Sequence, residues 1–372
     1  MKIKISAHQL FSSIILVPLG SALLFFLAPE AKQDVWLAVL IYIFPAIILQ
    51  VIYTSLWNKY PQDSIVTYMP KIFGKFIGNI LSVIYIIYFA YISARILRDF
   101  QELMLVAIMP KMPPIIISIM ITSVIGYGVY LGLENMCRAA HILLYLWIFY
   151  FIMEWLILFI TPDALQIHNL KPVLENGIVF VIKKSWKIIT FPYGETILFT
   201  MFFPYTVEVS KVRKASVLAI IAEGIFISLN TVIFIATLGV EYASTSLFPL
   251  LQTLRIMRIG EAFDRVDVFV IFIIVLVGFV KASFFLYGAM LGTAQLIKLK
   301  DTKYLAIPFS IILLITSQLI AKNFPQHIYI GQVFTLKYIH LPVAIIIPII
   351  ALLVYHIRNL GKKNSPTSEQ QN

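Results

Sequence analysis

The chain has 372 residues, of which 60% are hydrophobic and 13% are charged. Soluble domains carry about 25% charged residues, so this composition excludes an ordinary soluble enzyme and predicts an integral membrane protein. The net charge of +11 does not indicate nucleic-acid binding, because the basic residues form short clusters between apolar runs, as membrane-flanking loops do. Cys137 is the only cysteine, which excludes a disulfide within the chain.

Long apolar runs predict the membrane-spanning helices in chain order. Four spans that contain ionisable residues are expected near 136–160, 186–206, 214–240 and 267–297. The remaining spans are runs without Asp, Glu, Lys or Arg, each long enough to cross a bilayer, which takes about 20 residues: Ile5–Pro29, Val35–Asn58, Phe76–Ala94, Met112–Leu133, Tyr304–Ala321 and Tyr338–Ile357. We therefore predict an all-α integral membrane protein of about ten transmembrane helices.

Two of these spans carry proline and glycine at mid-depth. The first contains Val17–Ala22 (VPLGSA) and the sixth contains Thr190–Thr196 (TFPYGET). Proline removes a backbone donor and glycine permits unwound backbone, so each sequence either kinks its helix or interrupts it. Interruptions at matching positions of two halves are typical of inverted-repeat transporters, which bind their substrate at the membrane midplane. We interpret the two breaks as a site for a zwitterion, with Glu195 facing its ammonium group.

This interpretation predicts one membrane domain over residues 1–360, with repeat 1 at about 5–160 and repeat 2 at about 186–358. The polar segment 361–372 is expected to be a disordered cytoplasmic tail. Lys and Arg are more frequent in the loops on the side of the N-terminus, so the positive-inside rule places both termini in the cytoplasm. An apolar stripe along 247–257 predicts a helix that either lies at the membrane surface or caps the bundle.

Ionisable residues at membrane depth are the other candidates for function. A charge at the bilayer centre costs about 2.5–3.5 kcal/mol, so Glu195 and Lys281 should face the bundle interior and pair, either as a packing contact or against a ligand. The third span runs on to about Ile108, and its residues Arg95, Arg98, Asp99 and Glu102 share one face. That face either lines a water-filled vestibule or lies at a helix end outside the hydrocarbon.

No motif of enzyme chemistry accompanies these charges. The HExxH, CxxC, GxxxxGK and GxSxG patterns are absent, so we expect no enzyme activity and no cofactor or metal site. The six histidines are scattered, and we expect them at the membrane interface. Glu154 and Glu223 have no evident partner in the sequence and fit either a bundle-interior or an interfacial position.

Several segments together resemble the B-subunit permeases of bacterial spore-germination receptors, within the amino acid–polyamine–organocation superfamily. The resemblance covers about residues 4–358, and FPYGE at Phe191–Glu195 is its most specific signature. The first break departs from many amino-acid transporters of the superfamily, which have two glycines there, whereas this chain has only Gly20 beside Pro18. The other segments that carry the resemblance are Ile5–Leu10, Leu19–Ser21, Arg98–Pro114, Gly260–Asp267 and Lys281–Phe284.

The resemblance implies a LeuT-like 5+5 inverted repeat with helices 1 and 6 broken. It implies a nutrient sensor, typically for amino acids, in the spore inner membrane, assembled with a membrane-embedded A subunit and a C-subunit lipoprotein. A secondary active amino-acid transporter and a structural subunit without ligand remain alternatives. The ammonium of Lys281 would take the place of a coupling sodium ion. The expected ligand-binding residues lie between spans one, three, six and eight: Pro18, Leu19, Gly20, Ser21, Leu97, Phe191, Pro192, Tyr193, Gly194, Glu195, Lys281, Ser283 and Tyr287.

Overall fold

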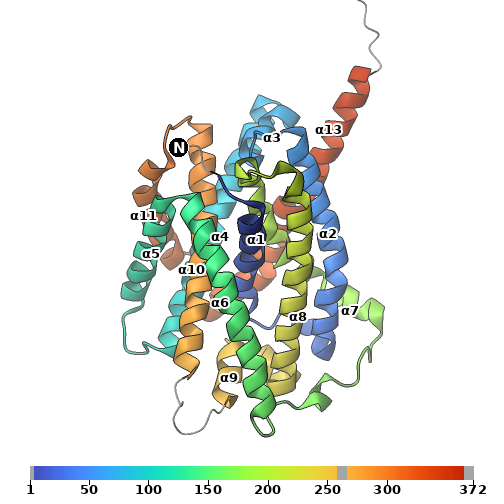
Figure 1. Cartoon of the computed structure of the whole chain (residues 1–372), viewed down its shortest axis with the longest axis vertical. Coiled ribbons are helices and arrows are strands. Elements are labelled where there is room, and N and C mark those ends of the chain that lie inside the picture. The colour runs from blue at the N-terminus through green and yellow to red at the C-terminus, as the bar shows by residue number, and fades with distance from the viewer. Residues whose placement is uncertain (1–3, 258–265, 364–372) are drawn as a thin grey trace, which may run out of the picture.

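The computed structural model describes residues 4–257 and 266–363 as a bundle of helices along one long axis (Figure 1). Within these residues, extended pairing is limited to one parallel bridge between Ile5 and Thr206. The segment Gly260–Asp267 that contributes to the family resemblance lies largely outside the described residues. The last helix continues to Lys363, so the first residues of the expected tail are helical, and 364–372 lie outside the description.

Eight helices of the described part are long and apolar enough to cross a membrane. They correspond to eight of the ten predicted spans. The long helices are α2 (Val35–Lys59), α4 (Lys75–Ala107), α5 (Pro114–Leu131), α6 (Leu133–Ile160), α8 (Val212–Thr245), α10 (Val266–Leu296), α11 (Ala306–Leu319) with the preceding 3-10 segment η8 (Thr302–Leu305), and a composite of α12 (Phe324–Tyr329), the π-helical η9 (Ile330–Ile346) and α13 (Ile347–Lys363).

The last span begins earlier than the sequence indicated. We expected it at Tyr338, but its helix begins at Phe324. Lys337 interrupts the charge-free run, yet its side chain is exposed and lies over the ring of Tyr338 at 5.2 Å. Searching for runs without charged residues therefore excluded the first half of this span, which carries most of its polar residues.

The two remaining predicted spans are the two with breaks, and neither is a continuous long helix. Span one consists of α1 (Ala7–Ala22) followed by irregular backbone to the 3-10 segment η1 (Pro29–Asp34). Span six consists of short 3-10 segments: η3 (Trp186–Ile189), η4 (Tyr193–Met201) and η5 (Phe203–Tyr205). Interruption of spans one and six is thus confirmed, but the position expected for the first is wrong, because Val17–Ala22 is still helical and the backbone leaves the helix only at Leu23. The count of ten crossings and the repeat relation remain predictions.

The two broken spans are tied together where span one begins and span six ends. Ile5 exchanges backbone hydrogen bonds with this segment, from its N–H to the carbonyl of Tyr205 at 2.9 Å and from the N–H of Val207 to its carbonyl at 2.9 Å. Helix α1 then begins at a capping box between Ser6 and Gln9. The carboxylate of Glu208 accepts a further hydrogen bond from the Ala7 N–H at 2.8 Å. The local sequence therefore sets where α1 begins, and hydrogen bonds to the segment 205–208 fix this end of the helix in place.

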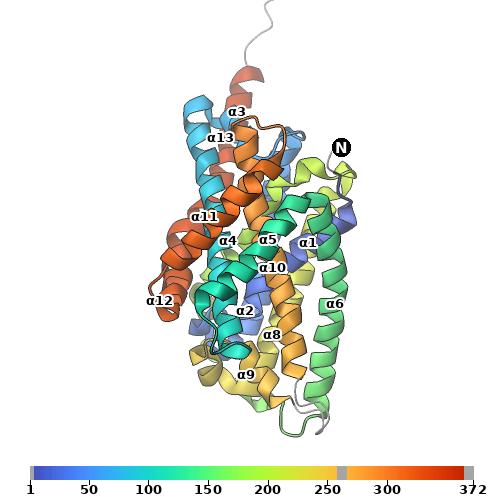
Figure 2. The same cartoon turned by 90° about the vertical axis from the view of Figure 1, so that its left-hand side faces the viewer.

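Helix α10 occupies the centre of the bundle, packed against α1, α4, α5 and α6 (Figure 2). Of the eight long helices it is the most buried. The short helices α3 (Ile65–Phe73), α7 (Ile178–Lys184) and α9 (Pro249–Ile256) lie toward the ends of the bundle (Figure 1). Helix α9 confirms the amphipathic helix expected in the loop after α8, and Leu250, Leu251 and Leu254 are its buried face.

The first and last described residues lie on the same side of the bundle, as an even number of crossings requires (Figures 1 and 2). The predicted cytoplasmic location of that side remains an expectation from the distribution of basic residues.

Candidate functional site

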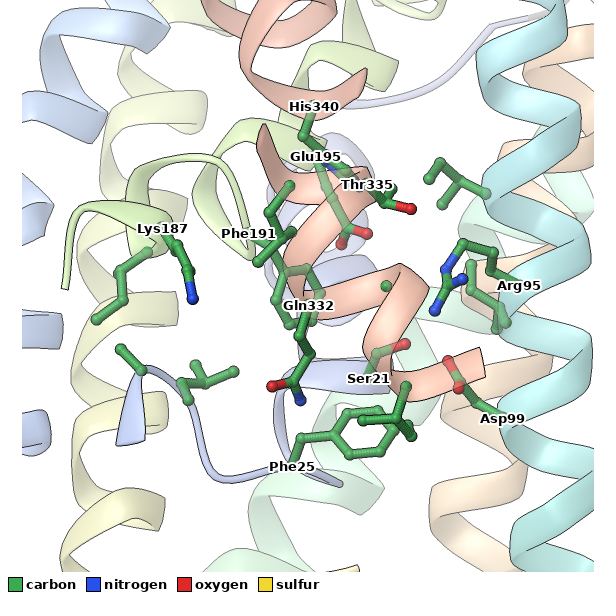
Figure 3. A pocket seen from close by; sticks show the side chains of 18 of the residues that line it. Ser21, Phe25, Arg95, Asp99, Lys187, Phe191, Glu195, Gln332, Thr335 and His340 are labelled. Atoms are coloured by element: carbon green, nitrogen blue, oxygen red, sulfur yellow. The ribbon is translucent and has the colours of Figure 1, made fainter. Parts of the chain in front are cut away.

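A cavity at mid-depth lies where the broken spans meet α4 and η9 (Figure 3). It contains about 780 Å³ of space between atoms, part of which is open to solvent. A few polar groups on a mostly apolar, concave wall are the usual form of small-molecule sites. The residues that give it polar character are Ser21, Glu30, Arg95, Asp99, Lys187, Glu195, Gln332, Thr335 and His340.

The break of span one contributes only its end to the cavity wall. Ser21 lines the cavity, and its buried hydroxyl has no hydrogen-bond partner. Pro18, Leu19 and Gly20 are buried without lining it. Gly20 faces α10 instead, where an added Cβ would lie 3.0 Å from the Cβ of Lys281. In this conformation the glycine permits close packing of α1 on α10.

The break of span six alternates between the cavity and the protein interior. Phe191 and Glu195 line the cavity, whereas Pro192, Tyr193 and Gly194 are buried behind it. The Tyr193 hydroxyl donates to the carbonyl of Val39 on α2 at 2.9 Å. A Cβ on Gly194 would lie 3.1 Å from the Ile189 carbonyl and 3.3 Å from the Cβ of Ala344. These contacts place η4 between α2 and η9, with one carboxylate directed into the cavity.

Glu195 and Lys281 form a buried ion pair. The Lys281 Nζ lies 2.6 Å from a carboxylate oxygen of Glu195, and their side chains are 0% and 4% exposed, respectively. The same ammonium lies 5.1 Å from the centroid of the Phe191 ring. The expectation that these two residues pair is confirmed. Each charge compensates the other, so neither depends on a ligand for its partner.

A second buried polar cluster joins α4 to the last span. Arg95 Nη2 donates to the carbonyl of His327 at 3.0 Å, and Asp99 Oδ1 lies 2.8 Å from His327 Nε2. Both α4 residues line the cavity, and the water-filled vestibule expected along that face remains a prediction. Arg98 differs, because it turns to Gln318 on α11 at 3.4 Å.

The eighth span does not form the wall that the sequence assigned to it. Lys281 does not line the cavity but contacts two residues that do, Glu195 and Phe191. Tyr287 packs against Phe202 with ring centroids 6.2 Å apart. Leu97 on α4 and Ser283 on α10 line two other cavities. Residues of η9 form this wall instead. Ligand contact by any of the predicted residues remains a prediction.

Sequence reasoning missed the contribution of the last span. His327 and His340 are buried, at 0% and 3% exposure, so the expected interfacial position is wrong for them. Hydrogen bonds to tyrosines of α4 hold this span: Tyr88 to His340 at 3.1 Å and Tyr91 to Thr335 at 2.9 Å. The polar residues spaced through 326–340 could have indicated this contribution. The expected span began only at Tyr338 and therefore left most of them out.

An ion pair between η1 and η3 also lines the cavity. Lys187 Nζ is 2.7 Å from Glu30 Oε1, and both side chains are partly exposed. Within the described residues, no group of three or more His, Cys, Asp or Glu side chains could hold a metal ion.

Comparison with known proteins identifies the family. The sequence profile described as "Spore germination protein" matches residues 4–325. The chain belongs to this family. Spore germination protein KB of Bacillus subtilis (strain 168) is 36% identical over 95% of this chain and 95% of its own length. Spore germination protein YndE of the same organism is 25% identical, covering 89% of this chain and 90% of its own length. The family resemblance in the sequence is thus confirmed.

Solved structures of transporters share the fold of this spore germination protein. MhsT in complex with L-phenylalanine superposes with a TM-score of 0.64 at 12% identity, covering 95% of this chain and 89% of that chain. Mhp1, a nucleobase-cation-symport-1 family transporter with bromovinylhydantoin bound, gives a TM-score of 0.61 at 10% identity, covering 99% and 95%. These likenesses establish a LeuT-type transporter fold for a multi-pass integral membrane protein.

Proposed function

We propose that this protein is the nutrient-sensing membrane subunit of a spore germination receptor, and that its mid-depth cavity binds the nutrient. One observation carries the proposal: the two interrupted spans converge on a cavity with an unpartnered buried hydroxyl, Ser21 Oγ, in its wall. An unpaired buried polar group is costly and marks a position where a ligand can supply the partner. Membership in the spore germination family supplies the biological role.

Two buried serines allow a matched test of this cavity. Ser21 and Ser283 both have unpartnered hydroxyls, but they line different cavities. In the source organism, Ser21→Leu should abolish or strongly weaken the germination dose response, because the larger side chain fills the cavity. Ser283→Leu should weaken it much less. Equal effects of both variants at equal protein levels in the spore membrane would argue against this cavity as the sensing site.

The family resemblance leads us to propose an A subunit and a C-subunit lipoprotein as partners. Deletion of the A-subunit gene should leave this protein unstable or silent, which is measured by its level in the spore membrane and by germination. A full nutrient response from this chain alone would argue against the subunit role.

Secondary active transport is the second candidate, favoured by the fold shared with MhsT and Mhp1. Because one fold hosts several functions, fold alone does not decide between sensing and transport. Uptake of radiolabelled amino acids into proteoliposomes would support transport. Binding without uptake, together with co-purification of two partners, would support sensing.

A further inference from the structure

Arg95 is a buried cation without a full set of partners. It is 9% exposed, and its Nη1 has no hydrogen-bond partner. Guanidinium has five N–H donors, yet the clear acceptor near it is the His327 carbonyl, 3.0 Å from Nη2. His327 Nε2 is 3.3 Å away but cannot also accept, because it donates to Asp99. In the described part of the chain, no carboxylate forms an ion pair with Arg95.

The position of this guanidinium is built into the last span. Gly331 of η9 lies directly against it, and a Cβ there would collide with Arg95 Nη2. The carbonyl of His327, one turn earlier, holds the same nitrogen. Arg95 lines the cavity, and these contacts fix the orientation of its guanidinium against η9 (Figure 3). A planar guanidinium fixed in this way suits two-point binding of a carboxylate.

Asp99 supplies the opposite charge one helical turn along α4. Its carboxylate lines the same cavity and accepts a hydrogen bond from His327 Nε2 at 2.8 Å. It forms no ion pair with Arg95, although residues four apart on a helix are neighbours. The other charges around the cavity are compensated, in the pairs Glu195–Lys281 and Glu30–Lys187. The cavity therefore presents one unpaired cation beside one carboxylate.

We propose that Arg95 and Asp99 bind the two charged groups of a zwitterionic amino acid. The guanidinium of Arg95 binds the carboxylate, and the carboxylate of Asp99 binds the ammonium group. This inference rests on the proposed function and assigns two residues of the same cavity to the charged groups of its ligand. It replaces the assignment of the ammonium group to Glu195, which Lys281 already occupies.

Binding to the purified full-length protein in lipid nanodiscs, with its partner subunits where they co-purify, tests this pairing. The probes are the twenty common L-amino acids, and for each one that binds, its primary amide and its deaminated carboxylic acid. The amide lacks the carboxylate, and the deaminated acid lacks the ammonium group. For the wild type, we expect both analogues to bind about 10- to 100-fold more weakly, since charge-assisted hydrogen bonds are lost.

Each variant should remove discrimination against one analogue only. In Arg95→Gln, the amino acid and its amide should bind equally, while the deaminated acid remains disfavoured. In Asp99→Asn, the amino acid and its deaminated acid should bind equally, while the amide remains disfavoured. The retained discrimination shows that each variant is folded. Arg98→Gln is the matched control, because Arg98 contacts Gln318 on the α11 side and does not line the cavity. It should bind as the wild type does.

Two results would overturn the inference. One is unchanged discrimination against the amide in Arg95→Gln together with unchanged discrimination against the deaminated acid in Asp99→Asn. The other is a wild-type protein that binds none of the amino acids. If that protein instead binds a neutral sugar, and Ser21→Leu abolishes this binding, the zwitterion inference fails while the proposed sensing function stands.

Discussion

The bundle contains two buried charge clusters close to the same cavity, and they differ in completeness. Glu195 and Lys281 come from η4 and α10 and meet at 2.6 Å with almost no exposure. Arg95 and Asp99 lie one turn apart on α4, form no ion pair with each other, and both contact His327. Arg95 keeps an unpartnered Nη1, whereas both charges of the first cluster are compensated within the protein.

This difference separates a structural role from a recognition role. Breaking a complete buried pair leaves an uncompensated charge in a low-dielectric interior, so the fold depends on it. Removing an incompletely paired cation relieves part of its desolvation cost, so the stability of the fold depends on such a cation less. Binding of a ligand that supplies the missing partner depends on it more. The role of a charged residue at mid-membrane depth therefore follows from the partners that compensate its charge, and not from its depth alone.

The largest expected effect is the loss of the complete pair. Lys281→Met should destabilise the protein by about 3–5 kcal/mol, because Glu195 then remains buried without its counter-charge. The measurement is thermal unfolding in detergent or nanodiscs, alongside the amount of folded protein. Lys281→Met combined with Glu195→Gln should recover much of that stability. Failure of the double variant to recover any stability would show that the lysine acts through contacts other than this pair.

The next effect concerns the contact that brings α1 against the complete pair. A Cβ on Gly20 would lie 3.0 Å from the Lys281 Cβ and 3.3 Å from the Val277 carbonyl. Gly20→Leu should therefore destabilise the protein by about 1–3 kcal/mol through overpacking and reduce the germinant response. Gly20→Ala should have a smaller effect in the same direction. A normal dose response and unchanged stability in Gly20→Leu would contradict this packing.

The incomplete cluster should contribute little to stability. Arg95→Gln should change the free energy of unfolding by about 1 kcal/mol or less, since the guanidinium leaves donors unpaired in the wild type. The same thermal unfolding assay, without added amino acid, compares it directly with Lys281→Met. A loss as large as that of Lys281→Met would show that Arg95 is a structural residue and would remove the contrast between the clusters.

A smaller, pH-dependent effect is expected at the start of α1. The hydrogen bond from the Ala7 N–H lowers the pKa of Glu208 below its ordinary value. Because the folded pKa is depressed, the carboxylate stabilises the fold above the ordinary glutamate pKa of about 4.3, and this contribution is lost as pH falls through the folded pKa. Wild type should be more stable than Glu208→Gln at pH 7, with a difference that shrinks toward pH 3. A difference that does not vary with pH would contradict this role.

Replacement of sodium should have no effect, which is the smallest change predicted here. Lys281 already provides a fixed ammonium between the broken spans, where sodium-coupled members of this fold are expected to hold a cation. Amino-acid binding or germination measured with choline in place of sodium should therefore match the sodium control. A strict sodium requirement in the wild type would show that the ammonium does not substitute for an ion.

Much of the architecture could be predicted from the sequence alone. Apolar runs located eight long helices because hydrophobic length is a local property that the bilayer thickness sets. The two proline–glycine segments located the interrupted spans for the same reason, since backbone restriction acts within a few residues. The pairing of Glu195 with Lys281 was also predictable, because few groups at that depth could compensate either charge.

Only the tertiary structure decided what forms the cavity. Arg95 and His327 are 232 positions apart, and nothing in either local sequence indicates that α4 and the last span share a polar interface. The same packing turned Gly20, Tyr193 and Ser283 away from the cavity that we expected them to line. Whether a buried charge is satisfied depends on neighbours brought together by folding, and that is a property of the packed bundle rather than of any single segment.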